Sequence, residues 1–109
     1  IKMSNSEVQF DARANGTTEL IQSGITIKNG AKFKVAITME SATSGKICVN
    51  GNAVVSKTNF ASQTANSNIK DLLLGQLRVA GDTGDRLPIY DAKLYNTALT
   101  DQELIALTT

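Results

Sequence analysis

Three Asn-Gly pairs divide the first half of the chain, at Asn15-Gly16, Asn29-Gly30 and Asn50-Gly51. Asn and Gly are the residues that best tolerate the positive φ required at both central positions of a two-residue type I′ turn. Strand-like sequence flanks each pair. No helical segment separates the strands, so the pairs predict short antiparallel strands and exclude a parallel α/β sheet.

The strands themselves are marked by alternation of apolar and polar side chains. Residues 32–40 alternate best: Phe33, Val35, Ile37 and Met39 share one face, which predicts a half-buried strand with one wet face. Further strands are predicted over residues 8–14, 17–23, 45–50, 53–58, 72–74 and 89–95. The segments 45–50 and 53–58 form the clearest hairpin, across Asn50-Gly51-Asn52.

Polar residues dominate the stretch 59–70, which predicts a long surface loop with the ring of Phe60 beneath it. In the last predicted strand, Tyr90 and Tyr95 are an odd number of residues apart. They therefore face opposite sides, and one of them is expected in the core.

A single helix is predicted, at the end of the chain. Thr100 and Glu103 have the spacing of a capping box, in which the hydroxyl accepts from the Glu103 N–H and the carboxylate reaches back. Leu99 and Leu104 have the spacing of a hydrophobic staple. Leu104, Ile105 and Leu107 give the helix an apolar face. About eight residues are too few to stay helical alone, so the helix must dock on the sheet.

The bulk properties fit one domain, residues 1–109, and exclude several classes of function. The net charge is +1, from eleven basic and ten acidic residues without a basic run, which argues against nucleic-acid binding. No apolar run is long enough to span a membrane. The chain has no histidine and one cysteine, Cys48. Its position in an apolar strand indicates a small hydrophobic residue of a sheet.

In order along the chain, several segments resemble the concanavalin A-like, laminin-G-like jelly rolls. Gly45 to Gly51 is similar to the family's aliphatic strand that ends in Asn-Gly, and Leu72 to Gly75 to its next strand. The most specific part runs from Ile89 to Leu104, where Tyr-Asn-x-Ala-Leu-Thr-Asp-x-Glu-Leu follows the predicted last strand. The resemblance implies an all-β antiparallel β-sandwich with one short C-terminal helix. The family's jelly roll is longer and has more strands ahead of the match. Either this version is minimal, or its first strands lie in a missing segment, as in a C-terminal piece of a longer chain, or in another subunit.

The ending from Leu104 to Thr109 is similar to the C-termini of bacteriophage tail proteins and tail fibres that carry this domain. This resemblance implies a lectin-like adhesion module, located in the virion, in an appendage that is commonly a homotrimer and contacts host-surface glycan. A structural C-terminal cap that trimerises a fibre without binding glycan is the alternative. A polysaccharide-degrading enzyme is the third reading, and it would need two inward carboxylates facing one groove.

Glycan binding calls for aromatic and planar polar groups, and the candidates lie in two loops and the last predicted strand. Tyr90 stands beside Arg86, and the polar loop 59–70 offers amides; the full set is Asn59, Asn66, Asp82, Asp85, Arg86 and Tyr90. Asp82 and Asp85 are also weak candidates for calcium, since hard cations take carboxylate oxygens. Solvated turns and a packing tyrosine are the competing interpretations.

Catalysis is not expected. Glycoside hydrolysis needs two carboxylates about 5–9 Å apart. Glu40, Asp71, Asp91 and Glu103 are isolated in the sequence, Glu103 is used by the helix cap, and the Glu-x-Asp-x-x-Glu motif of the family's glucanases is missing.

Overall fold

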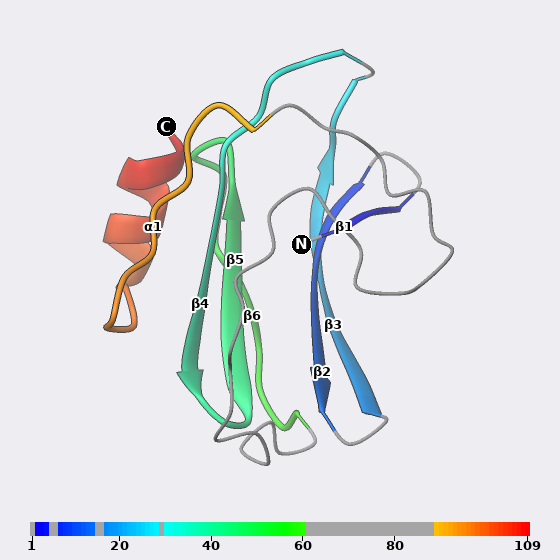
Figure 1. The fold of residues 1–109 in the computed structure, drawn as a ribbon, viewed down its shortest axis with the longest axis vertical. Coiled ribbons are helices and arrows are strands. Elements are labelled where there is room, and N and C mark those ends of the chain that lie inside the picture. The colour runs from blue at the N-terminus through cyan, green and yellow to red at the C-terminus, as the bar shows by residue number, and fades with distance from the viewer. Residues whose placement is uncertain (1, 5–6, 15–16, 29, 61–88) are drawn as a thin grey trace. The chain divides into compact units, whose positions relative to one another are not determined.

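A computed structural model describes residues 2–4, 7–14, 17–28, 30–60 and 89–109. In these residues it contains strands β1 (Lys2–Ser4), β2 (Glu7–Ala14), β3 (Thr17–Thr26), β4 (Val35–Ser41), β5 (Ser44–Val49) and β6 (Val55–Lys57), and helix α1 (Asp101–Thr108) (Figure 1). The strands form two three-stranded antiparallel sheets, in the orders β1-β2-β3 and β4-β5-β6. The predicted all-β fold with one C-terminal helix is confirmed.

Two of the three Asn-Gly pairs join strands that pair with each other, as predicted. Ala14 of β2 lies opposite Thr17 of β3, on either side of the first pair. In the β5–β6 hairpin, Asn50 and Gly51 have φ of 51° and 68°, and the Asn52 N–H donates to the Val49 carbonyl at 3.0 Å. Positive φ at both central positions is what the type I′ turn requires.

The Asn29-Gly30 pair has a different role, because it lies between β3 and β4, which belong to different sheets. A tight turn closes here, with the Ala31 N–H donating to the Lys28 carbonyl at 3.0 Å and Gly30 at φ 78°. This pair therefore marks the passage from one sheet to the other and not a hairpin.

The core lies between the two sheets. Its buried apolar residues come from strands of both and from the segments beside them: Val8, Ile21, Ile27, Ile47, Val49 and Phe60. Phe33, Val35 and Ile37 pack against this cluster, as their alternation predicted. The inward faces of the sheets thus form one dry layer, and the predicted burial of the Phe60 ring is confirmed.

The prediction of a wet outer face for residues 32–40 holds in part: Lys32, Lys34 and Glu40 are exposed, but Thr38 is covered. Thr38 is only 7% exposed, because α1 and the segment before it cover this face of β4 and β5. Met39, predicted on the apolar face, is 37% exposed. The strand also starts later than expected, at Val35. Alternation thus identified a face of the strand but not what covers it.

The prediction of a strand over residues 89–95 is wrong, since the structure gives this segment no regular secondary structure. Alternation specifies which side chains share a face, but a strand also needs a hydrogen-bonded neighbour. Leu94 is 82% exposed, and Tyr90 and Tyr95 are both exposed, so neither tyrosine is in the core. The predicted strand at 72–74 and most of the polar loop, residues 61–70, lie outside the described residues.

By compactness the chain divides into two units, residues 1–66 with 97–109 and residues 67–96. Both sheets and α1 belong to the first unit. The second unit contributes only residues 89–96 to the described part.

Candidate functional site

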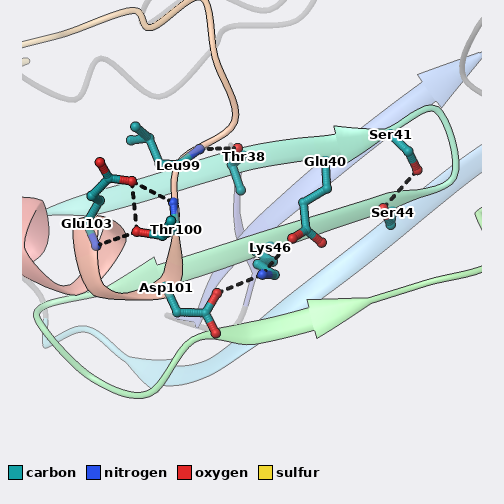
Figure 2. A network of polar contacts seen from close by, with 9 residues as sticks. All are labelled: Thr38, Glu40, Ser41, Ser44, Lys46, Leu99, Thr100, Asp101 and Glu103. Carbon is teal, nitrogen blue, oxygen red and sulfur yellow. Dashed lines mark hydrogen bonds and ion pairs between the residues drawn. The ribbon is translucent and has the colours of Figure 1, made fainter.

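A network of polar contacts joins the start of α1 to the outer face of β4 and β5 (Figure 2). The Lys46 ammonium contacts the Glu40 carboxylate at 2.6 Å and the Asp101 carboxylate at 2.7 Å. Hydrogen bonds to Asp101 and then to Glu40 raise the pKa of Lys46 above its ordinary value. One lysine of β5 therefore ties β4 and the helix together, and its side chain is only 17% exposed.

The first turn of α1 is capped as the sequence predicted. The Glu103 N–H donates to the Thr100 hydroxyl at 3.3 Å, and the Glu103 carboxylate accepts from the Thr100 N–H and hydroxyl, both at 2.8 Å. The Thr100 N–H, and then its hydroxyl, hold the pKa of Glu103 below its ordinary value. Just ahead of the cap, the Leu99 N–H donates to the buried Thr38 hydroxyl at 3.2 Å, which fixes the chain against β4 (Figure 2).

The last turn of α1 docks through a hydroxyl. Thr108 is buried, and its Oγ1 donates to the Leu104 carbonyl at 2.9 Å, accepts from the Gly51 N–H at 3.0 Å and lies 3.1 Å from Cys48 Sγ. The Cys48 thiol donates to the Asn52 carbonyl at 3.1 Å. Cys48 is thus buried in a sheet as predicted, and its sulfur also contacts polar atoms of the helix and the turn.

The predicted apolar face of the helix is only partly right. Leu104 is fully buried and Ile105 half-buried, but Leu107 is exposed and Thr108 takes the inward position. Positions four apart on a helix share a face, so Leu104 and Thr108 lie together. In the sequence, only the spacing of four residues from Leu104 pointed to burial of Thr108, because a threonine is not expected on the apolar face of a helix.

The carboxylates of Glu40, Asp101 and Glu103 are all engaged where the helix docks. In a retaining glycosidase the substrate lies between the two carboxyl groups. Here the Lys46 ammonium occupies that position between Glu40 and Asp101, and Glu103 is engaged by the cap. Each of the three groups already has a partner within the protein.

Of the six residues predicted to bind ligand, the structure describes two. Asn59 is exposed and has a left-handed φ of 61°, and Tyr90 is 74% exposed. They belong to different units of the chain. The other four, Asn66, Asp82, Asp85 and Arg86, lie outside the described residues. The predicted ligand site therefore stays a prediction.

Within the described part of the chain, no group of three or more His, Cys, Asp or Glu side chains is placed to hold a metal ion. Asp82 and Asp85, the weak calcium candidates, lie outside it. The described helix, α1, is too short to cross a bilayer, and the described residues contain no other candidate span.

Two antiparallel sheets packed across an apolar core, closed by a capped C-terminal helix, define a β-sandwich of the kind that lectins use. The family described as the concanavalin A-like lectin/glucanases superfamily (laminin G type) matches residues 1–105. The chain belongs to this family. No curated protein and no solved structure matches the chain.

Proposed function

We propose that this chain is a non-catalytic module that recognises a glycan on a host cell surface. The observation that carries the proposal is the family match over residues 1–105, because the family's lectin members bind carbohydrate on this sandwich. The ion pairing of Glu40 and Asp101 with Lys46 supports the non-catalytic part, since it leaves neither carboxylate free to act on a sugar.

The setting we propose is a bacteriophage tail fibre or tailspike, with the module in the virion as part of a homotrimer. Its support is the similarity of the ending from Leu104 to Thr109 to the C-termini of bacteriophage tail proteins. Closed cyclic symmetry would present three copies of a weak site to one surface, which raises avidity without new contacts.

We propose that the ligand contacts residues among the six predicted from the sequence. Tyr90 would supply an aromatic plane and Asn59 an amide, and each is exposed within its own unit. Asn66 and Arg86 would add hydrogen-bond donors, and Asp82 and Asp85 would accept from sugar hydroxyls or hold a calcium ion that does.

A glycan array followed by calorimetry on the best hit tests the proposal. We expect binding of a bacterial surface saccharide, and Tyr90→Ala should weaken it by about tenfold if the ring stacks on the sugar. Tyr95→Ala is the matched control, a second exposed tyrosine five residues along the same segment. Equal losses in the two variants would contradict the assignment of Tyr90.

Light scattering on the same sample, read together with the array, distinguishes a glycan-binding role from a structural one. A trimer in light scattering that binds no saccharide on the array would favour the fibre cap over the adhesion module. Repeating the titration with calcium and then with a chelator tests Asp82 and Asp85: unchanged affinity would argue against a bound cation.

A further inference from the structure

We propose that the C-terminal flap, residues 99–109 with α1 at its centre, opens as a unit separate from the sandwich and is released by acid. This inference is independent of any ligand. It rests on how the flap is held to the outer face of β4 and β5.

The flap has little apolar anchorage. Leu104 is its one fully buried apolar side chain; Leu99 and Ile105 are half-buried, and Leu107 is exposed. A helix of eight residues is not stable in water without its docking contacts. Loss of docking therefore means loss of the helix, while the core between the sheets contains no residue of the flap.

Charged and polar contacts hold the flap at both ends instead. At its start, Asp101 reaches Lys46 of β5, which also binds Glu40 of β4, and Glu103 closes the cap. At its end, Thr108 contacts Cys48 and Gly51. The Lys34 ammonium, just ahead of β4, donates to the Thr109 carbonyl. Four charged or titratable groups on the sandwich side of these contacts are described. Lys34, just ahead of β4, and Lys46 and Cys48 of β5 contact the flap directly. Glu40 of β4 contacts Lys46.

The Glu103 carboxylate, which closes the cap of α1, makes this arrangement sensitive to acid. Because the pKa of Glu103 is lowered in the folded protein, its contribution is present above the ordinary value of 4.5 and is lost as the pH falls through the folded value. Glu40 and Asp101 are the two partners of Lys46, so charge and not burial holds the start of the flap. The core cluster between the sheets contains no carboxylate among the described residues. The sandwich has carboxylate contacts of its own, Glu19 with Lys57 and Glu7 with the Gly24 N–H, but burial of apolar surface holds the two sheets together without them.

The protein contains its own reporter of opening. Cys48 is the only cysteine, it is 1% exposed, and its sulfur lies beneath Thr108 of the flap. Labelling with 4,4′-dithiodipyridine, which reacts with thiols in acid, follows its accessibility; the rate is normalised to the chain unfolded in guanidinium at each pH. Far-UV circular dichroism follows the sandwich in the same samples.

We expect the normalised labelling rate to rise by about tenfold or more between pH 6 and pH 3, which corresponds to about 1.4 kcal/mol in the free energy of opening. The strand signal should persist over that range. A labelling rate that stays constant, or that rises only together with loss of the strand signal, would overturn the proposal.

Two lysine variants localise the effect. Lys46→Met removes the ammonium that holds the flap, and we expect faster labelling at pH 7 with a weaker dependence on pH. Lys57→Met is the matched control, since Lys57 also pairs with a glutamate, at 2.9 Å, but in a contact between the sheets. Equal labelling in the two variants would contradict the proposal. Should Lys46→Met fail to fold, Asp101→Asn removes the same contact from the exposed side.

Discussion

Lys46 and Lys57 lie on neighbouring strands of one sheet, and each binds a carboxylate, yet the two contacts join different parts of the molecule. Lys46 points outward and holds α1, through Asp101 and Glu40. Lys57 reaches Glu19 of β3 at 2.9 Å and the Leu20 carbonyl at 3.3 Å, so it links the two sheets.

The two contacts differ in how much apolar surface is buried next to each lysine. Lys57 stands at the rim of the apolar core, its ammonium 5.6 Å from the centre of the buried Phe60 ring. Burial of apolar surface holds the sheets together there whether or not the ion pair forms. Behind Lys46 the helix contributes one fully buried apolar side chain, Leu104. Polar contacts therefore matter more for the helix than for the sandwich.

The largest expected effect is in the core. Ile47 is fully buried between the sheets, so Ile47→Ala should lower the free energy of unfolding by about 2–5 kcal/mol through lost burial and a cavity. Urea unfolding followed by circular dichroism measures it. Ser56→Ala, at an exposed position of β6, is the control and should stay within about 0.5 kcal/mol of the parent chain. If Ile47→Ala lost less free energy of unfolding than Leu104→Ala in the helix, the helix would be held by burial more than the sandwich, contrary to the comparison.

Leu104→Ala tests the helix side of the comparison. The side chain is fully buried, so the closed flap should lose about 2 kcal/mol, seen as a rise of roughly 30-fold in Cys48 labelling. Because the flap opens separately, unfolding of the strands should move less than in Ile47→Ala. Leu107→Ala removes the same atoms from an exposed position and should change neither measurement. If unfolding of the strands showed the full loss of about 2 kcal/mol, helix and sandwich would unfold as one unit.

Features of this fold that depend on residues close together in the sequence could be predicted, and features that depend on distant residues could not. The hairpin at Asn50-Gly51 and the cap at Thr100 and Glu103 are local, and both were predicted correctly. β1 was not predicted, and β3 continues past its predicted end at residue 23, through Gly24. There the Gly24 N–H donates to the Glu7 carboxylate at 2.7 Å, beside a shift in the register of β2 and β3.

The contacts that dock the helix could not be predicted, because they join residues far apart in the chain. Lys46 and Asp101 are 55 residues apart, and Cys48 and Thr108 are 60 apart. Neither pair forms a motif. The alternation in residues 32–40 identified the face of β4 that carries Thr38 but gave no sign that a helix covers it. For the ligand site, the sequence offered residue types in loops, and their arrangement stays a prediction.

The cap gives a smaller effect than Leu104. Thr100→Ala removes the hydroxyl that accepts from the Glu103 N–H, and we expect a loss of about 1 kcal/mol in helix docking. If helix and strands melt together, Tm should fall by about 4 °C. If the flap opens alone, Cys48 labelling should rise about fivefold with Tm nearly unchanged. Thr97→Ala, in the exposed approach to the helix, is the control. No change in either measurement would argue against the cap.

The smallest effect is expected at the rim. The Lys57 side chain is 41% exposed, so solvent screens its pair with Glu19, and Lys57→Met should cost about 0.5 kcal/mol or less. A double-mutant cycle with Glu19→Gln, measured by urea unfolding at low and high salt, isolates the pair from the rest of each side chain. The coupling should shrink at high salt, because exposed charges are screened within about 10 Å at 0.1 M. A large coupling that resists salt would mean that the rim, like the helix face, is held by charge, and the contrast between the two lysines would then disappear.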